Sequence, residues 1–93
     1  MSRQIKIEHA KLGRNKAFGM AENATRTIVV DEGAHSHERD LMDTYIHESL
    51  HIAQPELSEE AVVRVAAELA DVMWRVGYRR VILPKRGART KKR

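Results

Sequence analysis

The sequence predicts a small α+β domain in which short strands come first and two helices follow. Residues 2–30 contain stretches that alternate apolar and polar side chains or are rich in β-branched residues. Residues 37–76 instead repeat apolar side chains at helical spacing. The chain has 93 residues, which suits one domain. We expect that domain to span residues 1–84 and to be followed by a basic tail at residues 85–93.

Three short strands are expected before the first helix. Residues 2–8 place Ile5 and Ile7 on one side of the chain, as in a half-buried strand. Residues 17–21 form a second candidate strand, and residues 25–30 are the most β-branched stretch of the chain. Glu22-Asn23-Ala24 predicts a hairpin turn between these two. We therefore expect a mostly antiparallel three-stranded sheet packed on the helices.

The first helix is expected from residue 37 to residue 54. Ser36 is a suitable N-cap, and Pro55 ends the helical pattern. Apolar side chains recur at intervals of three and four residues and form a stripe that would pack on the sheet. This stripe consists of Leu41, Met42, Tyr45, Ile46, Ser49, Leu50 and Ala53.

The second helix is expected from Glu59 to about Val76. Ser58 supplies an N-cap oxygen, and the two glutamates that follow it lie where the helix dipole favours acids. Gly77 is a natural residue for the position after the helix end. A short connection between the two helices makes them antiparallel neighbours.

The first helix carries a possible metal-binding motif, His47-Glu48-Ser49-Leu50-His51. Residues four apart lie on one face of a helix, so His47 and His51 can offer two imidazole nitrogens to one ion. Glu48 would lie beside a water bound to that ion. Two histidine ligands with an adjacent carboxylate are typical of a zinc peptidase. Asp43, one turn before His47, can bind the second ring nitrogen of that histidine, as second-shell partners of zinc ligands do.

A third ligand must come from histidine or a carboxylate, because the chain contains no cysteine. The turn between the helices should bring Glu59 and Glu60 close to the end of the first helix, and either can complete a His-His-Glu site that leaves a fourth position for water. His35 and His37 are the other candidates. They come before the start of the helix, about three turns from His47, so we expect them to lie too far from the other two ligands.

The motif, the proline turn and the pattern of the second helix together resemble very small metallopeptidases of phages and bacteria, similar in plan to minigluzincins. The resemblance covers about residues 28–80 and includes Leu-Ser-Glu-Glu-Ala-Val at 57–62 and Trp-Arg-Val-Gly-Tyr-Arg-Arg at 74–80. It implies a minimal zincin-like fold and a phage-encoded origin. Glu60 with the following Ala-Val resembles the start of the ligand helix in thermolysin-like enzymes, so Glu60 is the preferred third ligand and Glu59 the alternative.

The expected function is a zinc-dependent metallopeptidase that hydrolyses peptide bonds of a peptide or protein, with Zn²⁺ as cofactor and Glu48 as general base. The substrate is expected to add as a strand to a sheet edge, either at residues 18–20 or at residues 27–30. No residue stands out as a donor to the developing oxyanion. The candidates are His9, Tyr45, Arg64 and Tyr78.

The formal net charge of +4 reflects the end of the chain. The last nine residues hold six basic and no acidic side chains, which leaves 11 basic and 13 acidic ones in the rest. A basic tail can bind nucleic acid or another acidic partner. The alternative function is therefore a nucleic-acid-associated or virion structural protein that keeps a zincin-like fold, with zinc structural or absent. Its candidate contacts are Arg79, Arg80, Lys85, Arg86, Arg89, Lys91, Lys92 and Arg93.

No stretch of the sequence has the length and apolar character of a membrane span, and the first residues lack the apolar segment of a signal peptide. We therefore expect no membrane partner and a cytoplasmic location. A phage-encoded protein would lie in the host cytoplasm or in the virion.

Overall fold

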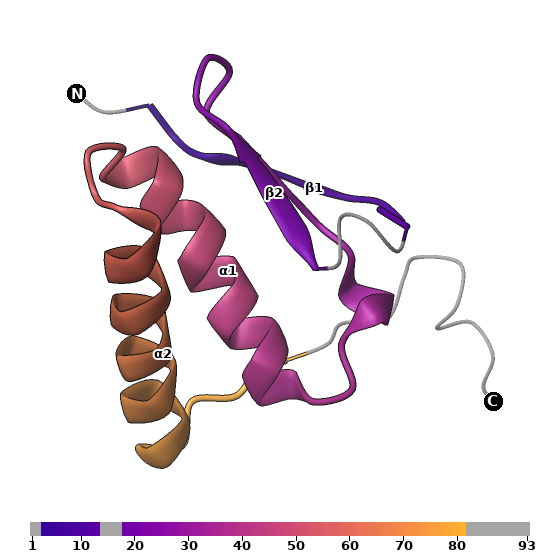
Figure 1. Ribbon diagram of the computed structural model, residues 1–93. Coiled ribbons are helices and arrows are strands. Elements are labelled where there is room, and N and C mark those ends of the chain that lie inside the picture. The colour runs from indigo at the N-terminus through magenta and orange to yellow at the C-terminus, as the bar shows by residue number, and fades with distance from the viewer. Residues whose placement is uncertain (1–2, 14–17, 82–93) are drawn as a thin grey trace, which may run out of the picture.

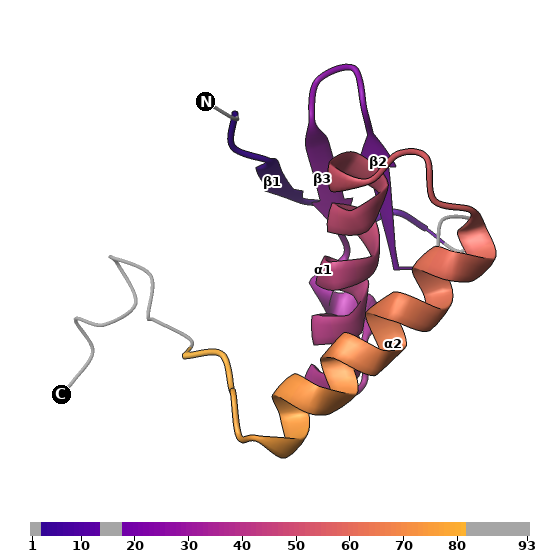
Figure 2. The same cartoon turned by 90° about the vertical axis from the view of Figure 1, so that its left-hand side faces the viewer.

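The computed structural model describes residues 3–13 and 18–81, and it has the predicted α+β class (Figure 1). The expected tail at 85–93 lies outside these residues. Helix α1 lies between the sheet and α2, so the described chain forms three layers (Figures 1 and 2). The elements in order are β1 (Lys6–His9), β2 (Gly19–Glu22), β3 (Thr27–Val30), the 3₁₀ turn η1 (Glu32–Ala34), α1 (Glu38–Ala53) and α2 (Glu59–Arg75).

The sheet is mixed, so the prediction of a mostly antiparallel sheet is wrong. Its strand order is β1-β3-β2. β2 and β3 pair antiparallel, with Gly19 opposite Val30, whereas β1 and β3 pair parallel, with Lys6 opposite Thr27. The antiparallel pair is the predicted hairpin, in which the Arg26 N–H donates to the Asn23 carbonyl at 3.2 Å. β1 pairs with the other side of β3. The alternation of side chains in a strand does not indicate whether it pairs parallel or antiparallel with a strand that is distant in sequence.

The core lies between β3 and α1. Ile28 and Val30 alternate along β3 and are buried against Leu41 and Ile52 of α1. β1 is exposed along its whole length, and Ile7 keeps 56% of its surface in solvent. The expectation of a half-buried strand at residues 2–8 is thus confirmed only for Ile5, which precedes β1 and packs partly buried against the core. It is wrong for β1 itself, because α1 packs on β2 and β3.

The helix ends agree with the sequence patterns, with one exception. Ser36 is not the N-cap of α1; His37 takes that position, and its carbonyl accepts the Leu41 N–H at 3.1 Å. Ser58 caps α2 as predicted. Gly77 follows α2 with φ +100°, a left-handed conformation that glycine adopts without a steric penalty.

Helix α2 packs on α1 through a narrow stripe of small and medium side chains. Val62, Ala66 and Ala70 are fully buried in this contact. Alanine at two of these three positions lets the helix backbones approach closely, which holds the start of α2 against the second half of α1. None of the described helices is long and apolar enough to cross a membrane.

Candidate metal centre and adjoining cleft

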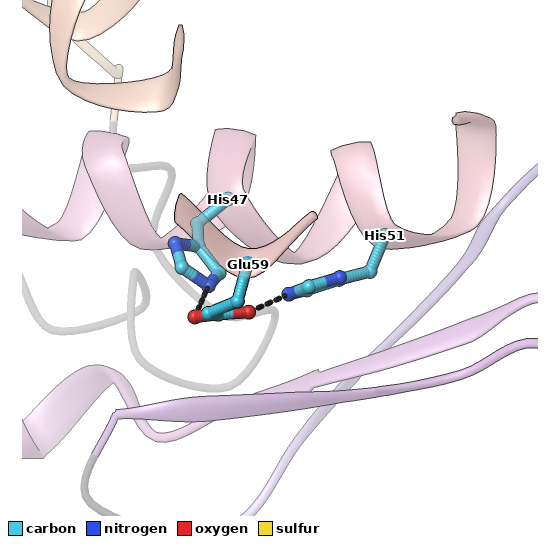
Figure 3. Close-up of side chains that lie close together, drawn as sticks. All are labelled: His47, His51 and Glu59. Carbon is cyan, nitrogen blue, oxygen red and sulfur yellow. Dashed lines mark ion pairs between the residues drawn. The ribbon is translucent and has the colours of Figure 1, made fainter. Parts of the chain in front are cut away.

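Three side chains from two helices converge beside the turn that joins them: His47 and His51 of α1 and Glu59 of α2 (Figure 3). The Glu59 carboxylate lies between the two rings. One of its oxygens is 3.3 Å from His47 Nε2 and the other is 3.0 Å from His51 Nε2. One ligand atom from each residue fits within a group whose members are all within 4.8 Å of one another.

The backbone of the two helices fixes this arrangement. His47 and His51 are one turn apart on α1, with their ring centroids 5.0 Å apart. The connection between the helices is short and is closed by an internal hydrogen bond, which the Leu57 N–H donates to the Gln54 carbonyl at 3.0 Å. Ser58 then starts α2 by accepting the Ala61 N–H on its hydroxyl oxygen at 3.1 Å. Glu59 is thereby the first residue of α2 and faces the end of α1.

The geometry brings Glu59 to the histidines, whereas the sequence favoured Glu60. Successive helical residues differ by about 100° around the helix axis, so only one of two adjacent glutamates can face α1. Glu60 is exposed and has no ion pair within the part of the chain that the structure describes. His35 and His37 are not part of the group either, as their positions before α1 predict.

The donor set fits zinc. Ligand atoms about 2.0–2.2 Å from a tetrahedral zinc ion are about 3.3–3.5 Å from one another, and one atom from each of the three residues already lies within 4.8 Å of the other two. Two imidazoles and one carboxylate are also the ligand set of zinc enzymes that keep a fourth position open.

Glu48 is buried next to this group, with 9% of its surface exposed. Its carboxylate has no hydrogen-bond or ion-pair partner among the described residues, and it lines a cleft of about 570 Å³. Burial raises the Glu48 pKa, and the nearby charge of Glu59 adds to this rise, whereas His47 and His51 oppose it. A carboxylate with a raised pKa is a stronger proton acceptor than an ordinary glutamate.

Gly19 at the start of β2 allows the strand to approach α1 at this point. A Cβ atom at this position would lie 3.1 Å from the Thr44 methyl carbon, 3.1 Å from the Val29 carbonyl oxygen and 3.2 Å from Glu48 Cγ. All three distances are tighter than ordinary carbon contacts. The glycine therefore permits the strand edge to lie directly over the Glu48 side chain.

The cleft lies between the start of β2, the η1 segment and the first half of α1. His35, whose place in the cleft sequence reasoning missed, donates from Nδ1 to the Asp31 carbonyl at 2.9 Å, and its Nε2 is 2.7 Å from the Thr44 hydroxyl. Its ring packs on Phe18 with centroids 4.7 Å apart. The lining residues are Phe18, Gly19, Ala34, His35, Ser36, Asp40, Asp43, Thr44, His47 and Glu48.

Asp43 also lines this cleft, one turn before His47. Burial raises its pKa, and the charges of His47 and Arg39 oppose that rise. No hydrogen bond joins Asp43 to His47 among the described side chains, so their interaction in this structure is electrostatic. The role of Asp43 as a partner of the His47 ring therefore remains a prediction.

A second polar cluster lies away from the cleft and contains His9, Glu32, Glu38, Tyr45 and Arg80. The Tyr45 hydroxyl donates to Glu32 and lies 2.7 Å from His9 Nε2. Arg80 pairs with Glu32 at 2.6 Å and with Glu38 at 3.1 Å. Tyr45 and His9, two candidate oxyanion donors, are thus engaged here and do not line the cleft.

The other candidates among the described residues fall outside the cleft as well. Tyr78 lines a separate, mainly apolar pocket with Trp74, and Arg64 is exposed on α2. Arg79 lies over the Trp74 ring, 3.3 Å from its centroid, and donates to the Trp74 and Tyr78 carbonyls. Both Arg79 and Arg80 therefore have partners within the chain. The remaining basic candidates, at positions 85–93, lie outside the described residues.

Comparison of the chain with protein-family models, with curated proteins and with solved structures gives no match.

Proposed function

We propose that this protein is a zinc-dependent metallopeptidase in which His47, His51 and Glu59 hold the metal and Glu48 is the general base. The observation that carries the proposal is the convergence of three suitable ligands beside a buried carboxylate that has no described partner and opens into a cleft. The resemblance of the motif to small phage and bacterial metallopeptidases of the zincin type supports the same function, and with it an origin in a phage.

A zinc ion held by these ligands would lower the pKa of a bound water toward neutrality and polarise a peptide carbonyl. Glu48 accepts the proton that the attacking water releases. A carbon–oxygen bond forms at the carbonyl, the carbon–nitrogen bond breaks, and Glu48 returns the proton to the leaving amine. The raised Glu48 pKa suits both transfers.

The substrate backbone would pair with the free edge of β2. β3 is bonded to a strand on each side, so the expectation that residues 27–30 form the receiving edge is wrong. β2 is an edge strand, and the cleft is lined by Gly19 at its start and by the preceding Phe18. A peptide added there as a further strand would pass over Glu48 and His47.

Zinc binding tests the ligand assignment. We expect one zinc per chain by isothermal titration calorimetry and by metal analysis at pH 7.5. Glu59→Gln removes one charged ligand and should weaken binding by about a hundredfold or more, whereas Glu60→Gln is the matched control and should bind as the wild type does. If Glu60→Gln lost zinc and Glu59→Gln kept it, the ligand set proposed here would be wrong.

Hydrolysis tests the role of Glu48. The zinc-loaded wild type should cleave peptides from an unstructured protein such as casein, and Glu48→Gln should bind zinc normally with hydrolysis lowered by at least about a thousandfold. A Glu48→Gln variant as active as the wild type would rule out the mechanism. Zinc binding without any hydrolysis by the wild type would instead indicate a structural ion that ties α1 to α2.

The alternative of a nucleic-acid-associated or virion protein rests on the basic residues 85–93, because Arg79 and Arg80 have partners within the chain. Its test is a truncation after residue 84. A nucleic-acid-binding protein would lose its affinity and the salt dependence of that affinity, whereas cleavage of short peptides would be unchanged.

A further inference from the structure

The cleft beside the metal centre has an acidic side and an aromatic side. Asp40, Asp43 and Glu48 contribute carboxylates, and no lysine or arginine is among its described lining residues. Phe18 and His35 form the aromatic side, and Phe18 keeps 49% of its surface exposed. A volume of about 570 Å³ accommodates a long side chain together with part of its backbone.

Asp40 and Asp43 lead from the outer end of the cleft toward the metal centre. They lie seven and four residues before His47, so all three side chains fall on one side of α1. Arg39 is the neighbouring cation on this helix. Its guanidinium pairs with Asp71 of α2 at 3.2 Å, and its charge acts on Asp43 only through space. The two aspartates thus have no ion-pair partner among the described residues.

Glu48 connects this cleft with the metal centre. The residue is nine-tenths buried, and the described chain offers no donor to its carboxylate. Its oxygens are open to the cleft that the residue lines, so a group entering the cleft can reach them. A peptide bound over Glu48 would extend along the cleft toward Asp43 and Asp40.

The aromatic side distinguishes between cationic groups. His35 is held at both ring nitrogens, by the Asp31 carbonyl and the Thr44 hydroxyl, and its ring supports Phe18 from one side. A fixed aromatic face favours the planar guanidinium of arginine over the compact ammonium of lysine, because the guanidinium can stack on a ring while its N–H groups point at carboxylates.

We propose that this cleft is the subsite for an arginine side chain of the peptide substrate, with Asp40 and Asp43 accepting its N–H groups and Phe18 stacking on its plane. This inference rests on the proposed function, since it assigns the substrate class of the same site. A peptide with arginine at one position near the cleaved bond binds and is cleaved in preference to peptides that lack it.

The test uses the full chain loaded with zinc and carrying Glu48→Gln, so that peptides bind without being cut. Short alanine peptides carry one arginine at each position in turn, and a second set carries citrulline, which has the same shape without the charge. We expect arginine at one position to bind at least about tenfold more tightly than citrulline by fluorescence titration, as for a charge-assisted pair. No preference for arginine at any position would overturn the proposal.

Two further variants assign the effect to the cleft. Adding Asp40→Asn and Asp43→Asn should abolish the difference between arginine and citrulline. Glu68→Gln, which removes an exposed acid of α2 that does not line the cleft, should leave it unchanged. A preference that survives the double aspartate change, or one that Glu68→Gln removes, would come from general charge attraction and would overturn the assignment.

Cleavage by the wild type separates this inference from the proposed function. Cleavage of arginine and citrulline peptides at equal rates would overturn the arginine subsite and leave the peptidase intact. Arginine binding that depends on the two aspartates, together with no cleavage of any peptide, would support the subsite and remove the peptidase function. The two failures therefore give different results.

Discussion

Gly19 shows how one missing side chain positions the candidate site. Its Cα lies where β2, the neighbouring Val29 carbonyl and the Glu48 side chain meet, and two of the three closest atoms belong to α1 side chains. A strand residue with a Cβ would separate the sheet from the helix at this point. The distance between the free strand edge and the proposed general base therefore depends on this glycine.

Gly19→Ala should destabilise the fold and impair hydrolysis while leaving zinc binding intact. The added methyl group must displace Thr44 or Glu48, because the Val29 carbonyl is fixed in the sheet, and overpacking of this kind costs about 1–3 kcal/mol. Urea denaturation measures this cost. Gly33→Ala is the control, since its Cβ would meet only Asp31 Oδ1 at 3.8 Å, and it should change the stability by less than about 0.5 kcal/mol. Equal stability of the two variants would contradict this account.

At the same scale, sequence spacing was sufficient to bring His47, Glu48 and His51 together, because the helix repeat alone places them. It could not choose between Glu59 and Glu60, since that choice depends on the rotation of α2 about its axis, which the Ser58 cap and the helix contact fix. The role of His35 was also hidden, because its partners Asp31 and Thr44 lie on either side of the η1 turn and the start of α1.

At the scale of elements, Glu32 joins four segments of the chain. Its carboxylate accepts the Tyr45 hydroxyl of α1, pairs with Arg80 beyond α2 and lies 3.4 Å from His9 Nε2 of β1. The Tyr45 hydrogen bond lowers the Glu32 pKa, and Arg80 lowers it further, against the opposing effect of burial. The ionised form is therefore the one that holds these elements together.

This cluster predicts an acid-dependent loss of stability. Because the Glu32 pKa is lower in the folded chain, its contribution is complete above the ordinary glutamate pKa of about 4.3 and is lost as pH falls through the lower folded value. The difference in unfolding free energy between wild type and Glu32→Gln should be constant from pH 7 to about pH 5 and shrink below about pH 4. Glu68→Gln, without a described ion pair, should show no such trend. A difference that grew on acidification would refute the prediction.

The hairpin and both helices were predictable, because each depends on local signals such as the turn at Asn23, the cap at Ser58 and the glycine at position 77. The parallel pairing of β1 was not, because alternation carries no information on strand direction. The exposure of Ile7 was not predictable either, because α1 packs on the other two strands and only Ile5 reaches the core. The three strands and two helices were expected, but the way in which the first strand packs against the others was not.

At the scale of the whole molecule, α1 packs against the sheet on one side and against α2 on the other, whereas α2 packs mainly against α1. Packing of α2 on α1 rests on a small stripe with two alanines, and the His47–His51–Glu59 group lies at the N-terminal end of α2. A metal bound there would join the outer layer to the middle one at the point where the two helices are connected.

Hydrogen exchange should detect the proposed metal link between α1 and α2. Zinc should slow amide exchange most strongly at the start of α2, around residues 59–66, and only weakly in β3, and it should raise the melting temperature. Glu59→Gln should abolish both effects, whereas Glu60→Gln should retain them. Uniform protection of the whole chain by zinc would show that α2 does not separate from α1 before global unfolding.

Because the three proposed ligands come from both helices, the site exists only in the folded chain, and with zinc as the ligand the stability of the fold would depend on metal supply. At a free zinc concentration one hundred times the dissociation constant, binding would add about 2.7 kcal/mol to the unfolding free energy. A domain of this size has a small margin of stability, so the amount that escapes degradation in a cell would rise and fall with available zinc. Because the ligands come from two helices, zinc supply would thus control the amount of folded protein as well as its activity.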